Sequence, residues 1–243
     1  MKKSIAINQP TFLPWIGWFD LLDQTDIFVI LDDVQFSKQS WQQRNRIKTD
    51  KGLELIIVPV KNKKNQTILE VEILNNSFEK KIIKSVLTNY KKSKYFDKYF
   101  KEFSYIIKKS IEEGNLSKLN INLIKWFIEI LNIKKKIFYS SEIDVKGKRS
   151  EYIAKICQYF NCNLYVSPIG AKTYISQEKY QFAKRNIEVK FQNYAHPLYS
   201  QLFKPFIPYA SILDLVFNEG QNSYSIMISG RKKLLSIEDF KNV

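Results

Sequence analysis

Glycine, cysteine and histidine are scarce in this 243-residue chain, with seven, two and one residues respectively. So few glycines argue against a nucleotide site cradled by Gly-rich backbone. Neither the phosphate-binding G-x-x-x-x-G-K-[ST] loop nor the G-x-G-x-x-G dinucleotide fingerprint is present. The G-x-S-x-G nucleophile elbow and the H-E-x-x-H zinc motif are also missing. The well-known motifs of nucleotide, ester and peptide chemistry therefore do not explain this sequence.

The two cysteines, Cys157 and Cys162, lie five residues apart. Two thiols without a nearby histidine make a poor zinc site. We expect two reduced thiols, with Cys157 on the apolar face of a helix. A disulfide or a metal pair is the alternative.

No apolar run reaches the roughly 20 residues that a membrane-spanning helix needs. The first three residues begin like a secretion signal, but the polar Asn8, Gln9 and Pro10 interrupt the apolar stretch. The composition, 44% hydrophobic and 26% charged, is that of a globular protein. We therefore expect a folded cytoplasmic protein without membrane insertion.

The net charge is +15, but only five of the 39 basic residues are arginine. The lysines are spread along the chain and concentrate in the expected helices. One interpretation is a solvated basic surface that no partner uses. The other is a preference for anionic partners such as nucleotide-sugars, tRNA or anionic lipid.

Strand-like and helical segments alternate along most of the chain. This alternation predicts an α/β fold with a mostly parallel sheet flanked by helices. Residues 68–74 alternate between apolar and polar positions, which is typical of a half-buried edge or antiparallel strand. The expected strands are residues 4–7, 26–31, 53–60, 137–139, 163–167 and 187–191, and the expected helices are residues 14–22, 151–160, 174–185 and 211–217.

Residues 77–135 differ from the rest because they are Lys-rich and carry three successive helical patterns. We expect an α-helical insertion here, whose aromatic residues form a core. The insertion would belong to a single domain of residues 1–230, followed by a loosely attached tail, residues 231–243.

Paired acids, Asp32 and Asp33, directly follow the buried strand 26–31. Ligands of open α/β sheets sit beyond the carboxyl ends of the strands. Adjacent carboxylates there could hold a divalent cation such as Mg²⁺, or one could act as a base. The alternative is that they cap a turn or the next element.

Arg44, Arg46 and Lys48 are spaced two apart, so in an extended segment they point the same way. Three cations beside Trp41 and Asn45 would suit a phosphate or diphosphate, for which the planar arginine fork is well shaped. The alternative is a strand edge protected by charge.

His196 is the only histidine in the sequence and precedes Pro197, Tyr199 and Gln201. Its ordinary pKa near 6.5 suits general acid–base catalysis. The competing interpretation is a structural histidine.

The residues just described resemble the WbqC-like family of bacterial O-antigen and other surface-polysaccharide gene clusters. The resemblance spans about residues 4–220, and its first and last segments are specific, whereas residues 77–135 carry little of it. Pro168 departs from the family pattern, which often has glycine after the preceding serine. The matching segments are residues 7–17 (INQPTFLPWIG), 28–48 (FVILDDVQFSKQSWQQRNRIK), 165–174 (YVSPIGAKTY) and 196–220 (HPLYSQLFKPFIPYASILDLVFNEG).

The resemblance implies a role in O-antigen or lipopolysaccharide biosynthesis, where a glycine-transferase activity has been suggested for the family. The catalytic candidates are then His196, Asp32 and Asp33. The substrate-binding candidates at motif positions are Gln9, Trp15, Gln35, Trp41, Arg44, Asn45, Arg46, Lys48, Tyr174, Tyr199, Gln201 and Asp214.

Three hypotheses follow. The first is a transferase that acylates an amino sugar carried on a nucleotide, with His196 as the base, Asp32 or Asp33 orienting the amine or binding Mg²⁺, and the cations holding the diphosphate. The second is a non-catalytic module that binds a nucleotide-sugar or a glycosyltransferase. The third is contact with RNA, such as an aminoacyl-tRNA donor. The first hypothesis needs the histidine, the acids and the cations to line one cleft.

Overall fold

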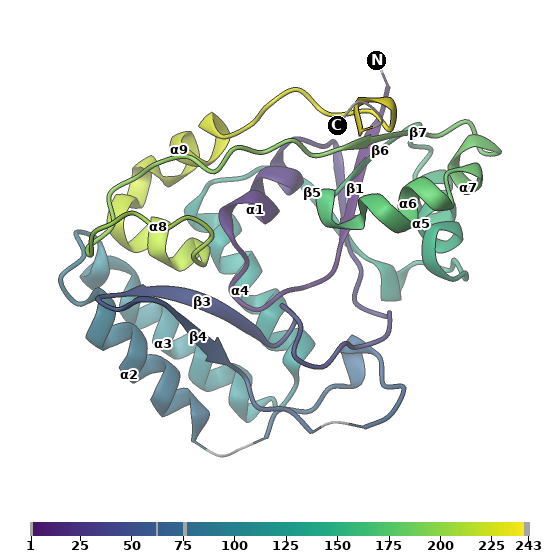
Figure 1. Ribbon diagram of the computed structural model, residues 1–243. Helices are drawn as coiled ribbons and strands as arrows, with labels where there is room; N and C mark the ends of the chain where they lie inside the picture. Colours follow the sequence, from purple (N-terminus) through teal and green to yellow (C-terminus); the bar gives the residue numbers. More distant parts are fainter. Residues whose placement is uncertain (1, 62, 75–76, 241–243) are drawn as a thin grey trace.

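The computed structural model describes residues 2–61, 63–74 and 77–240 (Figure 1). Its centre is a five-stranded sheet in the order β5-β2-β1-β6-β7, in which neighbouring strands are parallel. The expected α/β class with a mostly parallel sheet is therefore confirmed. The strands are β1 (Ser4–Asn8), β2 (Ile27–Ile30), β5 (Lys136–Tyr139), β6 (Leu164–Ser167) and β7 (Glu188–Phe191).

Helices cover both faces of this sheet. Successive side chains of a strand point to opposite faces, so each strand can contribute to a buried cluster on either side. In β1, Ile5 and Ile7 join one buried cluster and Ala6 joins another. The first cluster is closed by α5 (Arg149–Tyr159), α6 (Lys172–Gln177) and α7 (Tyr180–Ala183), and the second by α1 (Ile16–Asp23), α4 (Leu116–Ile130) and α8 (Ile212–Glu219).

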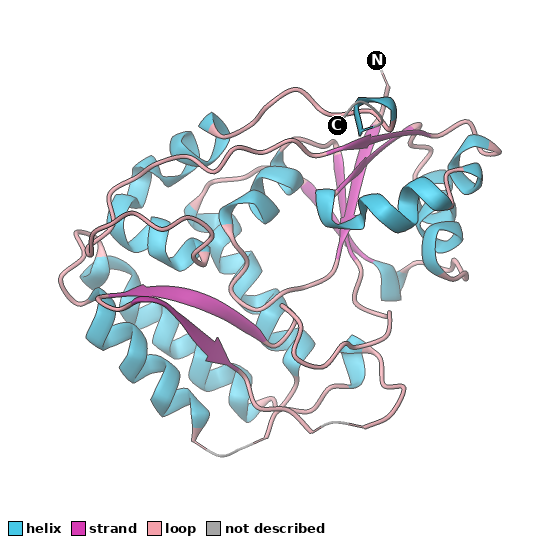
Figure 2. Cartoon of the chain, in the orientation of Figure 1, coloured by secondary structure: helices cyan, strands magenta, loops and turns pink. Residues whose placement is uncertain are grey.

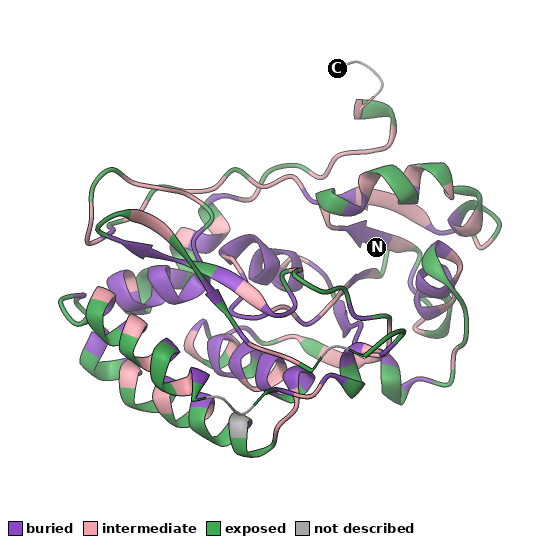
Figure 3. Cartoon of the chain, turned by 60° about the horizontal axis from the view of Figure 1, so that its bottom comes forward, coloured by how far each residue is buried: buried purple, intermediate pink, exposed green. Residues whose placement is uncertain are grey.

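The expected insertion forms α2 (Phe78–Tyr90), α3 (Phe96–Glu112) and α4. The buried side chains of these helices, such as Phe103 and Phe127, belong to the same cluster as Ala6 of the sheet. Figure 3 shows the outward faces of the helices exposed and the inward faces buried. These three helices therefore share the core of the domain and do not form a separate one.

A second, two-stranded antiparallel sheet is formed by β3 (Arg44–Thr49) and β4 (Gly52–Ile57). Figure 2 shows this hairpin apart from the parallel sheet. The strand expected at residues 53–60 thus exists, but it pairs with β3 outside the main sheet. The hairpin contacts both α2 and α8. It therefore connects the helical part of the chain to the C-terminal part.

The strand expected at residues 68–74 is wrong. Residues Ile68–Glu70 form a 3-10 turn, and Val60 bridges Ile73 as an isolated pair. The reason is local: the side chain of Glu70 accepts hydrogen bonds from the backbone N–H and hydroxyl of Thr67, closing a capping box. Such side-chain-to-backbone bonds compete with strand pairing.

The tail is attached at least as far as the structure describes it. Arg231, just beyond α9 (Ser223–Ser229), donates to Asp20 at 2.8 Å and to Asp23 at 2.6 Å. Further along, Leu235 and Phe191 exchange backbone hydrogen bonds. The loose attachment expected from residue 231 is thus not seen up to residue 240, and residues 241–243 lie outside the described part. Among the described residues, no helix is long and apolar enough to cross a membrane.

The contacts of Arg231 predict a large loss of stability when its side chain is removed. Asp20 is fully buried, and burial raises the pKa of its carboxyl despite the hydrogen bonds from Arg231 and Gln192. We expect Arg231→Ala to lower the free energy of unfolding by about 3 kcal/mol, because it leaves a buried charge without its partner. Urea unfolding measures this difference. The control is Lys155→Ala, which removes an exposed pair with Glu151 and should cost less than about 1 kcal/mol. Equal effects of the two variants would refute the buried-pair argument.

Candidate functional site

The order of the strands creates a switch point between β1 and β6. After β1 the chain builds β2 and β5 on one side of it, and later adds β6 and β7 on the other side. The two connections leave the carboxyl ends of β1 and β6 in opposite directions, which opens a crevice where ligands of such sheets bind.

A pocket of about 670 Å³ lies at this place. Its size is in the range of small-molecule sites. Residues that follow β1, β2, β6 and β7 form its base, and the loop before α1, the start of β3 and the loop before α8 complete it. The lining residues are Ile7, Asn8, Gln9, Thr11, Trp15, Gly17, Trp18, Leu31, Ser40, Trp41, Gln42, Asn45, Arg46, Ile153, Pro168, Ile169, Gly170, Ala171, Tyr174, Gln192 and Tyr209.

Aromatic rings and one cation surround the pocket. Trp15, Trp41, Tyr174 and Tyr209 all line it, and Trp41 and Tyr209 are about half exposed. The guanidinium of Arg46 lies 5.4 Å from the ring centre of Trp41. Arg46 is the only charged residue among the described residues of the lining. The pocket therefore offers flat apolar surfaces and one positive charge, with no carboxylate in its wall.

Asn45 holds the loop that carries Trp15. Its side-chain amide donates to the carbonyl of Phe12 at 3.0 Å and to that of Leu13 at 2.7 Å. Leu13 is buried and has a φ of 45°, a conformation that costs a non-glycine residue roughly 1–2 kcal/mol. The side-chain oxygen of Asn45 accepts from the backbone N–H of Arg46 at 2.8 Å, so the bonding capacity of the Asn45 amide is used within the protein.

The indole of Trp15 packs directly against Gly17. A Cβ atom at Gly17 would lie 2.2 Å from the Cη2 atom of Trp15 and 2.4 Å from its Cζ2 atom. The ring therefore rests directly on the backbone of the first turn of α1. This close approach explains the glycine at a helical position in a chain that has few glycines.

His196 lies within a cluster of aromatic rings that includes Trp15. Its ring stacks on Trp15 at a centroid distance of 6.3 Å and also meets Tyr199, Phe206 and Tyr209 at 5.2–6.1 Å. Its Nε2 atom is buried without a partner among the described residues, and its Nδ1 atom is 3.0 Å from the carbonyl of Pro197. Burial lowers the pKa of the imidazole, because it disfavours the charged form. His196 does not line the pocket but packs behind two residues that do.

The other C-terminal candidates bond to one another inside the protein. Asp214 is fully buried and accepts hydrogen bonds from Tyr199 at 2.9 Å and from Gln201 at 2.8 Å. Desolvation raises the pKa of the Asp214 carboxyl. Lys48 is also buried, and its ammonium donates to the carbonyl of Pro205 at 2.9 Å. Gln201 also bonds the backbone of Ile207, which connects this network to the loop that carries Tyr209.

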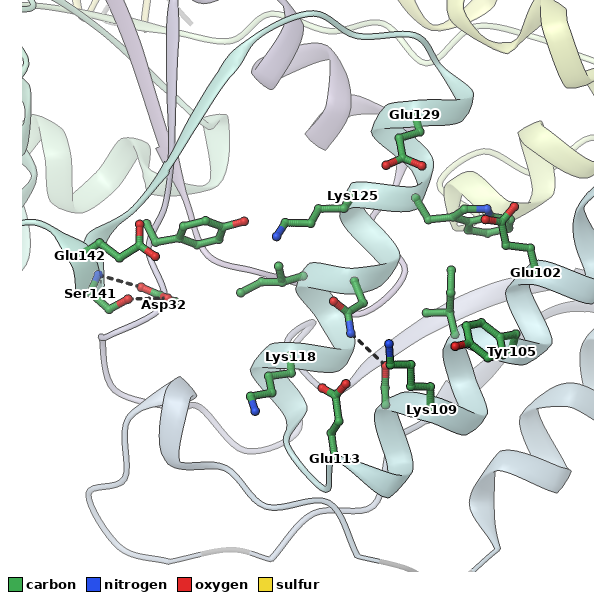
Figure 4. A pocket seen from close by; sticks show the side chains of 16 residues that line it. Asp32, Glu102, Tyr105, Lys109, Glu113, Lys118, Lys125, Glu129, Ser141 and Glu142 are labelled. Atoms are coloured by element: carbon green, nitrogen blue, oxygen red, sulfur yellow. Dashed lines mark hydrogen bonds between the residues drawn. The ribbon is translucent and has the colours of Figure 1, made fainter.

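One of the paired acids, Asp32, faces a different cavity, and both acids are hydrogen-bonded within the protein. Asp32 accepts from the backbone N–H and hydroxyl of Ser141, Asp33 accepts from the hydroxyl of Tyr152, and the two acids share the single hydroxyl proton of Ser140. Asp32 lines an open cavity of about 720 Å³ whose opposite wall carries Lys and Glu side chains of α3 and α4 (Figure 4). Within the described part of the chain, no three His, Cys, Asp or Glu side chains form a group that could hold a metal.

The single cleft that the first hypothesis needs is therefore not found. Neither His196 nor the acids belong to the lining that Arg46 shares with Trp15. The candidates that line the switch-point pocket are Gln9, Trp15, Trp41, Asn45, Arg46 and Tyr174. The candidates outside it are Asp32, Asp33, Gln35, Arg44, Lys48, His196, Tyr199, Gln201 and Asp214.

Asn8, Gln192 and Tyr209 are among the lining residues that the sequence analysis did not name as candidates. Asn8 ends β1, and Gln192 directly follows β7. The rule that drew attention to Asp32, the position after a strand, would have found both. Tyr209 comes from an irregular loop and has a φ of 65°, and no pattern in the sequence indicates it.

The fold and the pocket define an α/β protein with a ligand site at the switch point of a parallel sheet. The chain belongs to the WbqC-like protein family, which matches residues 9–226. It is also 34% identical over 221 residues to a Mycobacterium tuberculosis (strain ATCC 25618 / H37Rv) protein named "Uncharacterized protein Rv1507c", covering 90% of this chain and 94% of that one. No solved structure matches the chain.

The contact between Gly17 and Trp15 predicts a strong coupling between the two positions. We expect Gly17→Ala to destabilise the protein by about 1–3 kcal/mol, since the methyl group has no space under the indole. In a Trp15→Ala background the same change should become neutral or slightly stabilising, because alanine is the better helix former. Denaturant unfolding of the four proteins gives the coupling. Purely additive effects would show that the ring does not rest on the glycine.

Proposed function

We propose that the protein binds a nucleotide-linked sugar in the switch-point pocket and serves bacterial surface-polysaccharide biosynthesis, the setting that the WbqC-like family implies. The observation that carries the proposal is the guanidinium of Arg46, stacked on Trp41 at a pocket whose described lining has no carboxylate. Such a wall accepts an anionic phosphate without repulsion, and the arginine fork can bind its oxygens in a bidentate manner.

Further support comes from the aromatic rings. Nucleobases and the apolar faces of sugars both stack on aromatic side chains, which supply large contact areas. Trp15 and Tyr209 are held by the His196 cluster, and Trp41 is held by the hydrogen bond of its carbonyl with Phe12 N–H at 2.9 Å. The ring of Trp15 and the backbone of Trp41 are thus placed before a ligand arrives, which lowers the entropic cost of binding.

The test compares two arginines of the same strand. Arg46→Gln should weaken binding of a nucleotide-sugar by about 10- to 100-fold, because it removes a charge-assisted hydrogen bond. Arg44→Gln makes the same change of charge on β3 but outside the pocket lining, and should leave the affinity within about two-fold. Isothermal titration calorimetry with nucleotide-sugars measures both. Equal affinities of the two variants, or binding of no nucleotide-sugar by the unchanged protein, would contradict the proposal.

A second candidate is glycyl transfer to an amino sugar held in the same pocket. The observation that favours it is the unpartnered Nε2 atom of His196, one aromatic ring away from the cavity. In this reaction the amine attacks the acyl carbon, the bond to the donor oxygen breaks, and a base takes the amine proton. Exposure of Nε2 would need a movement of Tyr209, which is half exposed and lies on an irregular loop.

Mass spectrometry of the sugar product tests this second candidate. A nucleotide-amino-sugar is incubated with the protein and either glycine with ATP or glycyl-tRNA. Transfer adds one glycyl group, and His196→Ala should slow it by roughly 10²–10⁴ if the imidazole takes the proton. Persistent binding without any product, in both the unchanged protein and the variant, would instead identify a non-catalytic module that captures the nucleotide-sugar.

A further inference from the structure

The side-chain amides of the pocket are held in defined orientations by the protein. Gln42 accepts a hydrogen bond from the backbone N–H of Ser37 at 3.0 Å through its Oε1 atom. Its amide nitrogen therefore faces Gln9 and donates to the Oε1 atom of Gln9 at 2.8 Å. The amide nitrogen of Gln9 is left without a partner among the described residues. Because Gln9 lines the pocket, it presents an N–H donor there.

Asn8 presents a second donor next to it. Its Oδ1 atom accepts the backbone N–H of Gln9 at 2.9 Å, which fixes the oxygen away from the free side of the amide. The Nδ2 atom of Asn8 donates to none of the described residues, and Asn8 also lines the pocket. Two neutral donors thus stand together at the carboxyl end of β1.

Gln192 presents an acceptor at the carboxyl end of β7. Its amide nitrogen donates to the carbonyl of Gly17 and to Asp20, both at 2.8 Å. A carbonyl oxygen can only accept, so this orientation is not interchangeable. Both amide protons are used, and the Oε1 atom accepts no hydrogen bond within the described part of the chain. The side chain is 5% exposed and lines the same pocket as Gln9.

We infer that the pocket recognises a neutral amide group of its ligand, whose carbonyl accepts from Gln9 and Asn8 and whose N–H donates to Gln192. The inference rests on the proposed function and specifies its substrate class. Two kinds of group in a nucleotide-sugar carry this chemistry: the amide edge of a uracil, thymine or guanine base, and the N-acyl group of an amino sugar. A cytosine base has no ring N–H, and an unsubstituted hexose has no amide.

Recognition of this kind discriminates strongly. A pocket built to bond a polar group of the ligand rejects an analogue that lacks it, since the buried protein groups are then left unpaired. The affinities of ligands with and without the amide group therefore measure this discrimination.

The first experiment is calorimetric titration of the unchanged protein with UDP-glucose, CDP-glucose and UDP-N-acetylglucosamine. If the base supplies the amide, UDP-glucose should bind about ten-fold or more tightly than CDP-glucose. If the acyl group supplies the amide, the affinity for UDP-N-acetylglucosamine should exceed the affinity for UDP-glucose by a similar factor. Affinities of all three probes within about three-fold of one another would overturn the inference but leave the proposed function intact. Binding of none would refute both.

The second experiment removes the N–H donor of Gln9 and keeps the hydrogen bond that Gln9 accepts from Gln42. Gln9→Glu retains an oxygen for Gln42 to donate to, but replaces the pocket-facing N–H₂ with an oxygen. The preference for the amide-bearing probe should then fall from about ten-fold to near unity. The matched control is Gln158→Glu, the same substitution at an exposed residue of α5 outside the pocket, which should keep the preference. If Gln9→Glu does not fold, Gln9→Met removes the donor without adding charge. A preference that survives removal of the donor would overturn the inference.

Discussion

The pocket depends on the two hydrogen bonds that Asn45 donates to the carbonyls of Phe12 and Leu13. They join the hairpin to the loop between β1 and α1, and they hold Leu13 in a left-handed conformation that an isolated chain would avoid. Without these two hydrogen bonds, the turn of the loop at Leu13 would not be stabilised. Trp15, two residues further on, then has neither its place on Gly17 nor its contact with the C-terminal rings.

The same region joins segments that are distant in sequence. The backbone N–H of Ser211 donates to the carbonyl of Arg46, and that of Ile212 donates to the carbonyl of Pro14. The start of α8 is thereby fixed against both the hairpin and the N-terminal loop. Lys48, Gln201 and Asp214 are buried. The two most specific segments of the family pattern therefore meet in space, and Tyr199 and Gln201 of the second segment both donate to Asp214.

These contacts explain how much of the fold could be predicted from the sequence. Periodicity was sufficient for the parallel sheet and its helices, because β2 is apolar on both faces and α2 to α4 have clear apolar stripes. It failed at residues 68–74, where Thr67 and Glu70 bond locally, and it could not show that β4 pairs with β3. Both outcomes depend on hydrogen bonds that an apolar–polar pattern does not record.

Only part of the site could be predicted from the sequence, for a related reason. Trp15, Trp41 and Arg46 were recognised by residue type, and they do line the pocket. The same reasoning chose Lys48, Asp214 and His196, because a scarce or charged residue in a motif suggests chemistry. The structure buries the first two in a hydrogen-bonded network and places the third behind Trp15. A motif position thus identifies a residue that the fold needs, and tertiary contacts decide whether a ligand can reach it.

The distribution of charge leads to a last conclusion about selectivity. The chain carries a net charge of +15, yet the described lining of the pocket contains one arginine and no lysine. The many lysines can attract an anionic ligand to the surface from a distance, but this attraction is screened by salt and does not distinguish one ligand from another. Discrimination must come from groups that hold a fixed direction at short range. In this pocket those groups are the neutral amides of Asn8, Gln9 and Gln192, whose orientations are set by bonds to backbone and buried partners.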